Sequence, residues 1–377
     1  MSSTWPDKYV IGVTGNIATG KSVVRKMLEH LGAYGVDADA LSHRVMLKGA
    51  PGYQPIVATF GKWILSPDGQ IDRKKLGDLV FPNPEALAML EKILHPLIRQ
   101  SIDILIRRST QPVIVIEAIK LFEGDLHQHC DTIWVSDADE KTQIKRLVNK
   151  RGMTHSEARQ RAAMQDPQAK KLAVAKVIIR NNESFEKTWE QVSQAWEKYI
   201  PKQAPPAPSK QVEAGKLGVH RAGPKEAQKI ADFITRASQG ARRLTRTDIM
   251  ADFGEKAFLL LESGDTIAGL VGWKVENLVA RVDDFVLAKN IPFNEAIRAM
   301  MNEIESASSE LLCEALLLFL PPNLAQHTQV WAAQGYTPRT VKDLSVRAWQ
   351  EAAMESMTPG SVLYFKQLRK DRVLRPI

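Results

Sequence analysis

A short run near the start of the chain has the residue types and the spacing needed to hold phosphate groups. Residues 15–22 read Gly-Asn-Ile-Ala-Thr-Gly-Lys-Ser, which fits the pattern G-x-x-x-x-G-K-[ST]. Glycines permit a wrapped backbone whose N–H groups point inward at phosphate oxygens. In such a loop Lys21 would reach the β- and γ-phosphates, and the Ser22 hydroxyl would ligate Mg²⁺. The residues predicted to contact ATP are Gly15, Asn16, Ile17, Ala18, Thr19, Gly20, Lys21 and Ser22.

Carboxylates stand where two predicted strands end. Asp37 and Asp39 follow a short run that ends at Val36, and Glu117 directly follows the β-branched run 113–116. Ligands of open α/β sheets bind at the carboxyl ends of the strands. Beside a phosphate loop, one aspartate could take the proton of an attacking hydroxyl, and Glu117 could hold magnesium through water. Two structural roles stay open: Asp39 as a helix N-cap and Glu117 as a surface residue.

An α/β sheet is the architecture that would position these residues. Short apolar runs alternate with longer amphipathic stretches, as they do where parallel strands are buried on both faces. A helix after the loop would turn its positive N-terminus toward the phosphates. The predicted strands are 9–13, 113–116 and 132–135, and the predicted helices include 23–31, 85–108 and 141–150.

The chain is long enough for two domains, since its 377 residues exceed one typical core. We assign 1–200 to the phosphate-binding domain, 201–216 to a Pro-rich linker and 217–377 to a second domain. The second domain has an α+β pattern. Its predicted helices are 224–237 and 294–306, and its predicted strands are 257–262, 266–273, 281–287 and 313–320.

Charge and cysteine content indicate which kinds of partner and which compartment to expect. The net charge of +8 is spread along the chain, which suits a polyanionic small molecule as well as nucleic acid. We expect small-molecule substrates and neither nucleic acid nor membrane as a partner. Two distant cysteines indicate no disulfide framework, and without a signal peptide or a spanning segment we expect a cytoplasmic protein. The oligomeric state stays open.

An ordered set of short motifs over residues 9–200 resembles the dephospho-CoA kinase family. The phosphate loop comes first, followed by Asp37-Ala38-Asp39 with His43. Phe60-Gly61, Asp68-Gly69, Asp72-Arg73, Val80-Phe81 and His95-Pro96 then follow in the family's order. Gln143, Arg146 and Arg151 resemble the start of the family's lid, Arg161 and Gln165 resemble its end, and Asn181 resembles its late asparagine.

The resemblance implies a P-loop fold with a helical lid, and an enzyme that transfers the γ-phosphate of ATP, with Mg²⁺, to the ribose 3′-hydroxyl of dephospho-CoA. It implies that Asp39 is the base and that Lys21 and the lid residues Arg146 and Arg151 neutralise charge in the transition state. Asn181 would lie at the adenine. The residues implied to bind the acceptor are Asp37, His43, Arg73, His95, Arg99 and Glu117.

The sequence departs from this family at a few positions. Lys120 stands where the family has an apolar residue, Lys176 where it has aspartate, and Asn16 and Ala18 where it prefers glycine. These departures leave the main phosphate ligands intact, and they bear on acceptor affinity and rate more than on the type of reaction.

Residues 217–377 faintly resemble the GNAT acyltransferase fold, from Val219-His220-Arg221-Ala222 to Trp331-Ala332-Ala333-Gln334-Gly335-Tyr336. Their segment 287–294 lacks the glycines that a pyrophosphate needs for close backbone approach. We therefore expect a non-catalytic domain, with its tryptophans in the core. Two alternatives stay open: a bifunctional kinase–acyltransferase, and a nucleotide-binding regulator with weak or lost kinase activity.

Overall fold

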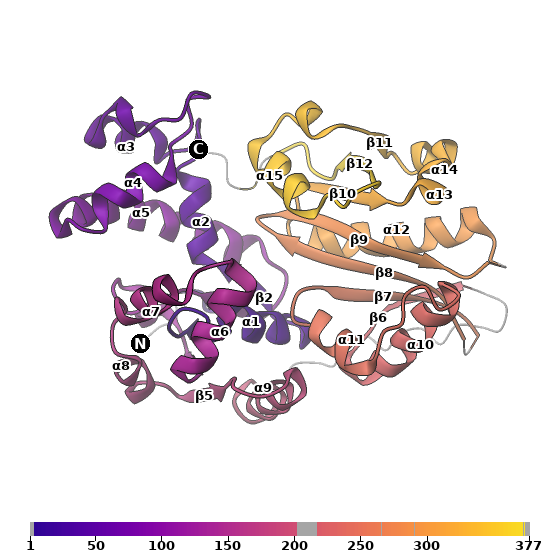
Figure 1. Ribbon diagram of the computed structural model, residues 1–377, viewed down its shortest axis with the longest axis horizontal. Coiled ribbons are helices and arrows are strands. Elements are labelled where there is room, and N and C mark those ends of the chain that lie inside the picture. The colour runs from indigo at the N-terminus through magenta and orange to yellow at the C-terminus, as the bar shows by residue number, and fades with distance from the viewer. Residues whose placement is uncertain (1–3, 202–216, 265, 290, 372, 374–377) are drawn as a thin grey trace. The chain divides into compact units, whose positions relative to one another are not determined.

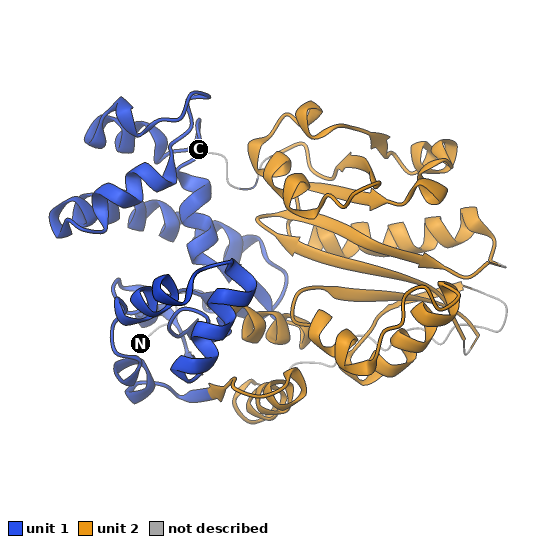
Figure 2. Ribbon diagram, in the orientation of Figure 1, with its two compact units in different colours: residues 1–21, 33–178, 372–377 blue, residues 22–32, 179–371 orange. Residues whose placement is uncertain are grey.

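The computed structural model describes residues 4–201, 217–264, 266–289, 291–371 and 373. The chain divides into two compact units (Figure 2). Unit 1 comprises residues 1–21, 33–178 and 372–377, and unit 2 comprises 22–32 and 179–371. This division assigns residues 22–32 and 179–200 to the second unit, unlike the sequence boundary. Apart from Pro201, the predicted linker lies outside the described residues, and the predicted domain boundary stays a prediction.

The first sheet has five strands in the order β2-β3-β1-β4-β5. The pairings of β1 with β3, of β1 with β4 and of β2 with β3 are parallel. Its central strands are nearly all apolar and fully buried, as expected for a parallel sheet covered on both faces. The strands are β1 (Tyr9–Thr14), β2 (Tyr34–Asp37), β3 (Val113–Glu117), β4 (Thr132–Asp137) and β5 (Val177–Arg180).

Helices of unit 1 form a helical subdomain and a lid beside this sheet (Figure 1). The subdomain has its own apolar cluster, which runs from Val45 to Leu94. Its helices are α2 (Ala38–Val45), α3 (Tyr53–Phe60), α4 (Arg73–Val80) and α5 (Pro84–Arg108), with the short 3₁₀ turn η1 (Lys62–Ile64). The lid helices are α6 (Glu140–Arg151) and α7 (His155–Ala163), and α8 (Gln168–Ala173) follows them. The turn η2 (Leu126–His129) lies between β3 and β4 in the chain.

Local signals fix where the lid helices begin and end. Gly152 ends α6 with a φ of 64°, the left-handed conformation that glycine adopts without strain. Thr154 and Glu157 then form a reciprocal capping box that starts α7. These two signals make a tight turn between the lid helices.

Unit 2 contains a second sheet of seven strands in the order β11-β12-β10-β9-β8-β7-β6. The pair β9–β10 is parallel and the other pairs are antiparallel. The strands are β6 (Leu217–Arg221), β7 (Ala257–Ser263), β8 (Thr266–Glu276), β9 (Val279–Leu287), β10 (Ala315–Leu320), β11 (Thr337–Pro338) and β12 (Val362–Gln367).

Helices cover both faces of this sheet (Figure 1). Leu259 and Leu261 of β7 face the cluster that includes α12, α13 and α14, whereas Phe258 and Leu260 face α10 and α11. α15 packs on the same face as α10 and α11. The helices of unit 2, including α1 and α9, which are not among those just placed on this sheet, are α1 (Lys21–His30, with Lys21 in unit 1), α9 (Phe185–Tyr199), α10 (Ala227–Ala237), α11 (Arg246–Asp252), α12 (Phe293–Glu310), α13 (Pro322–Ala325), α14 (Thr328–Ala333) and α15 (Arg347–Ser356), with the turns η3 (Pro224–Glu226) and η4 (Val341–Asp343).

The predicted fold class is confirmed: a parallel α/β sheet with a helical lid, and then an α+β unit. Each predicted strand is present to within a few residues. The helix expected over 224–237 is instead the turn η3 followed by α10. Trp273, Trp331 and Trp349 lie in the core, as expected. Among the described residues no helix is long and apolar enough to cross a membrane.

Candidate active site

The loop after β1 has the backbone that a phosphate cradle requires. Gly15 has a φ of 149°, and a Cβ there would lie 2.4 Å from the carbonyl oxygen of Ser136, so only glycine fits. Ala18 adopts a left-handed φ of 59°. An L-residue in that conformation costs about 1–2 kcal/mol, which explains why glycine would suit this position.

Lys21 brings a buried cation to the inner side of the loop. Its side chain belongs to a residue only 7% exposed, and its ammonium donates to the carbonyl of Asn16 at 3.0 Å. Burial lowers the pKa of Lys21, while the carboxylates of Glu117 and Asp39 raise it. Lys21 and the two predicted carboxylates therefore form one electrostatic group. Ser22 follows at the start of α1 and is exposed.

Asp39, the predicted base, is partly buried and accepts a backbone hydrogen bond. It lies in the first turn of α2, and one carboxylate oxygen accepts the Ile119 N–H at 3.3 Å. Burial raises its pKa to about 6, with a further contribution from Asp37. The N-cap role left open for Asp39 is wrong, because Asp37 caps α2 by accepting the Ala40 N–H at 2.8 Å.

Glu117 is not a surface residue. It is the last residue of β3, is 4% exposed and lies in register between Val13 of β1 and Asp37 of β2. The register thus brings together carboxylates from β2 and β3 at the end of the sheet where the phosphate loop begins. In the strand order, β3 and β2 lie on one side of β1 and β4 and β5 on the other. Ligands of such sheets usually bind at the carboxyl ends of the strands beside this switch point.

The lid packs directly on the phosphate loop. Ile17 shares a buried apolar cluster with Leu147 of α6 and Ala158 of α7. Arg146 donates to the carbonyls of Ala18 at 3.1 Å and Thr19 at 3.4 Å. Arg146 thus pins the lid to the loop.

Arg151, at the exposed end of α6, is close enough for its charge to lower the pKa of Lys21. Catalytic roles for Arg146 and Arg151 stay predictions.

A second set of contacts to the loop was not predicted from the sequence. The Gln165 and Gln168 side-chain carbonyls accept the N–H groups of Ile17 at 2.6 Å and Asn16 at 3.0 Å. Lys171 of α8 donates to the Asn16 side chain at 2.9 Å. The sequence signal for these contacts was Gln168 three residues before Lys171, which places both side chains on one face of the helix. Many solvent-exposed helices have the same spacing, so it does not by itself indicate a contact with the loop.

Residues predicted to hold the acceptor are spread over several elements. His43 of α2, Arg73 of α4 and His95 of α5 are all exposed. Arg99 of α5 pairs with Asp125 at 3.3 Å and lies over the Trp5 ring. Binding roles for these four residues stay predictions.

Two further predicted positions have defined surroundings. Asn181, predicted at the adenine, is buried in unit 2 and accepts a hydrogen bond from the Thr188 hydroxyl at 3.0 Å. Lys120 pairs with Glu91 at 2.6 Å and Glu123 at 3.1 Å. These two carboxylates balance the charge that replaces the family's apolar residue.

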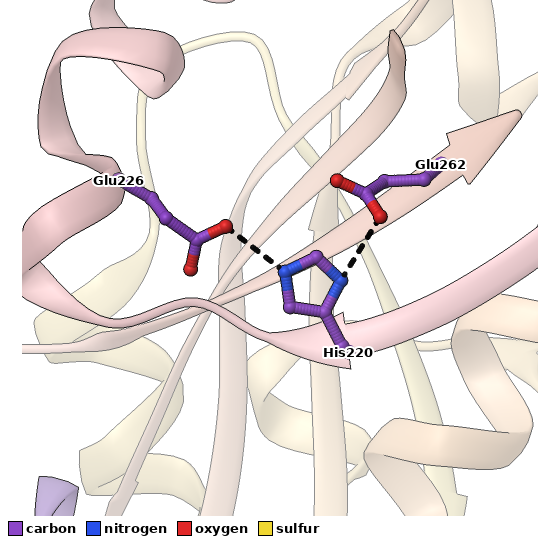
Figure 3. A group of neighbouring side chains, drawn as sticks. All are labelled: His220, Glu226 and Glu262. Carbon is purple, nitrogen blue, oxygen red and sulfur yellow. Dashed lines mark hydrogen bonds and ion pairs between the residues drawn. The ribbon is translucent and has the colours of Figure 1, made fainter. Parts of the chain in front are cut away.

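One group in unit 2 offers a metal-like set of donors, His220, Glu226 and Glu262 (Figure 3). The His220 Nε2 is 3.1 Å from a Glu226 oxygen, and Nδ1 is 3.6 Å from a Glu262 oxygen. One donor atom from each residue lies within 4.8 Å of the others, and the two ring nitrogens contact different carboxylates. The hydrogen bond to Glu226 raises the pKa of His220. We interpret the group as a protonated imidazole between two carboxylates.

Comparison with known proteins agrees with this geometry. A family model described as dephospho-CoA kinase matches residues 9–187. The chain is 41% identical over 195 residues to a dephospho-CoA kinase of Geobacter sulfurreducens, covering 51% of this chain and 99% of that protein. It is 43% identical over 196 residues to the enzyme of Geobacter metallireducens, covering 51% of this chain and 98% of that protein.

Solved structures resemble each part of the chain. A dephospho-CoA kinase from Campylobacter jejuni covers 51% of this chain and 97% of its own, with 27% identity and a TM-score of 0.35. A GNAT family acetyltransferase from Staphylococcus aureus covers 41% of this chain and 100% of its own, with 12% identity and a TM-score of 0.32.

A phosphate loop, a buried lysine and a partly buried aspartate thus occur in a chain that covers nearly the whole length of these relatives and is 41% and 43% identical to them over the aligned residues, and the chain belongs to the dephospho-CoA kinase family.

Proposed function

We propose that this protein transfers the γ-phosphate of ATP to the ribose 3′-hydroxyl of dephospho-CoA, giving coenzyme A and ADP. The observation that carries the proposal is the group formed by the buried Lys21 and Glu117 and the partly buried Asp39 beside the phosphate loop. A phosphoryl-transfer site needs this combination of a cation for the phosphates and a carboxylate for the acceptor.

Asp39 acts as the base in the proposed reaction. The acceptor oxygen forms a bond to the γ-phosphorus while the bond to the bridging oxygen of ADP breaks, and the hydroxyl proton goes to the Asp39 carboxylate. The raised pKa of about 6 makes this carboxylate a stronger base than an exposed aspartate, yet leaves it ionised at neutral pH. The Ile119 N–H fixes its orientation.

Positive charge stabilises the transferring group. Lys21 exchanges its bond to the Asn16 carbonyl for a phosphate oxygen, and Arg151 adds a second cation near it. The Ser22 hydroxyl, which the loop motif assigns to Mg²⁺, is a hard oxygen donor of the kind that Mg²⁺ prefers, and Mg²⁺ would neutralise charge on the phosphates.

Replacement of Asp39 tests the proposal. In Asp39→Asn the amide oxygen can still accept the Ile119 N–H, but the base is lost. We expect kcat for coenzyme A formation to fall about 10²–10⁴-fold, while ATP affinity changes little. Coenzyme A is measured by mass spectrometry after incubation of full-length protein with ATP, Mg²⁺ and dephospho-CoA.

The matched control is Asp78→Asn, which changes an exposed aspartate on α4 and should leave kcat unaltered. Wild-type protein that binds ATP but forms no coenzyme A would refute the proposed function and favour a nucleotide-binding regulator. Equal kcat in Asp39→Asn and wild type would refute the role of Asp39 alone.

For the rest of the chain we infer a non-catalytic role, because segment 287–294 contains no glycine for a pyrophosphate. A cytoplasmic location and the absence of a nucleic-acid partner remain predictions. Both accord with the substrates proposed, which are soluble polyanions that a net charge of +8 attracts.

A further inference from the structure

Lys171 is a buried cation to which the mechanism above gives no role. It lies on α8 and is only 7% exposed, whereas the side chain of its neighbour Lys170 is 72% exposed. Burying a lysine ammonium is unfavourable unless it is well paired. Its partners therefore indicate why the position is a lysine.

The Lys171 ammonium joins two segments of the active site. It donates to the side-chain oxygen of Asn16 at 2.9 Å and to the carbonyl of Ile119 at 3.3 Å. The Asn16 amide nitrogen donates in turn to the carbonyl of Asp166 at 3.0 Å, so both ends of this amide are fixed. Asn16 belongs to the phosphate loop, and Ile119 follows the end of β3.

Ile119 carries the connection on to the base. Its N–H donates to the Asp39 carboxylate at 3.3 Å, and its carbonyl accepts both Lys171 and the Thr14 hydroxyl, the latter at 3.2 Å. A continuous chain of hydrogen bonds therefore runs from Asn16 through Lys171 and Ile119 to Asp39. This chain links the groups that hold the phosphate donor to the group that activates the acceptor.

A second residue of α8 supports the same loop. Gln168 accepts the Asn16 N–H at 3.0 Å and donates to the Ser136 carbonyl of β4 at 2.9 Å. Gln168 anchors α8 to the sheet, so the Lys171 ammonium is held by a fixed element and not by a free side chain.

We propose that Lys171 is a positioning residue for phosphoryl transfer, whose ammonium holds the phosphate loop and the Asp39 carboxylate at a fixed separation. The inference rests on the proposed function. In-line transfer requires the donor phosphorus, the acceptor oxygen and the base to be aligned, and a misplacement of about 1 Å can lower the rate about 100-fold.

Kinetics of full-length Lys171→Met test this role. Methionine retains most of the apolar stem but cannot donate. We expect kcat to fall about 100-fold, while KM for ATP changes little because the loop amides and Lys21 remain. Lys171→Arg, which keeps a cationic donor, should regain much of the lost kcat. Lys170→Met is the matched control and should equal wild type.

A double-mutant cycle gives a readout that a purely structural role would not produce. If Lys171 acts through Asn16, then Asn16→Ala and Lys171→Met lower kcat together by no more than the larger single effect. Unfolding midpoints identify any variant that fails to fold, in which case Asn16→Ala and Lys171→Arg carry the comparison.

The outcomes separate the two proposals. Additive effects in the cycle, or a raised KM for ATP with unchanged kcat in Lys171→Met, would overturn the positioning role while leaving the proposed function intact. A wild type that forms no coenzyme A would overturn both.

Discussion

At the residue scale, the active site is a small set of buried charges that set one another's properties. Lys21 is buried and Asp39 is partly buried, and burial raises the pKa of Asp39 and lowers that of Lys21, which favours the neutral form of each. Their mutual attraction opposes this shift. The result is a carboxylate with a pKa of about 6 close to a cation that can bind phosphate. Phosphoryl transfer to an alcohol needs both groups.

If Asp39 is the base, as proposed, its ionisation sets the pH dependence of kcat. The base must be ionised to take a proton, so a folded-state pKa of about 6 predicts that kcat is constant above that pH and falls tenfold per pH unit below it. Burial and Asp37 raise this pKa, while Lys21 and the Ile119 N–H lower it. The measurement is coenzyme A formation at saturating substrates between pH 5 and 8.

Residual activity of Asp39→Asn provides the control, because it should lack this acidic limb. A wild-type kcat that stays constant down to pH 5 would mean that Asp39 behaves as an exposed carboxylate, contrary to its surroundings.

At the element scale, side chains at the ends of helices and strands hold the site and the second sheet together. Asp37 starts α2 and thereby sets where Asp39 points, while Gln168 and Lys171 fix α8 to the phosphate loop. In unit 2, His220 of β6 lies between Glu226 of η3 and Glu262 of β7 (Figure 3). This group ties an edge strand to its neighbour.

Stability of unit 2 should depend on pH through His220. Its folded-state pKa is raised, chiefly by the hydrogen bond to Glu226. The imidazolium therefore contributes stability that is fully present below its unfolded pKa of about 6.5 and is lost as pH rises through the folded pKa. We expect His220→Gln to lower the urea midpoint at pH 6 and to have a smaller effect at pH 8.5.

His155→Gln, at an exposed histidine of α7, is the matched control and should show no such pH-dependent difference. Equal losses for His220→Gln at the two pH values would mean that packing, and not the charged pairs, accounts for the contribution of His220.

At the scale of the whole molecule, the chain combines a kinase-family half with a unit built on a separate seven-stranded sheet. That second sheet has its own apolar clusters on both faces. Nothing in segment 287–294 supplies the glycine backbone that would cradle a second pyrophosphate. One nucleotide-derived substrate site, in the kinase half, is therefore expected.

Titration with acetyl-CoA tests that expectation on full-length protein. Any acetyl-CoA that binds should do so at the kinase's acceptor site and should be displaced by saturating dephospho-CoA in a calorimetric competition. Acetyl-CoA that remains bound under those conditions would contradict the non-catalytic assignment and favour the bifunctional alternative.

Much of the fold and the centre of the site follow from short-range patterns. The phosphate loop, the strands 9–13 and 113–116 and the carboxylates after them were predictable because backbone conformation and burial period are local properties. The turn at Pro224 was not predicted. The cap role of Asp37 was not predicted either, because either aspartate of Asp37-Ala38-Asp39 could begin the helix.

By itself the sequence determined the nucleotide loop, the class of fold and the family, because glycine spacing and strand periodicity are written in adjacent residues. Only the tertiary structure decided that Lys171 lies at the loop, since its contacts with Asn16 and Ile119 span 155 and 52 residues. Such contacts depend on how distant elements pack, and burial then converts an ordinary lysine or aspartate into a group with a shifted pKa and fixed partners.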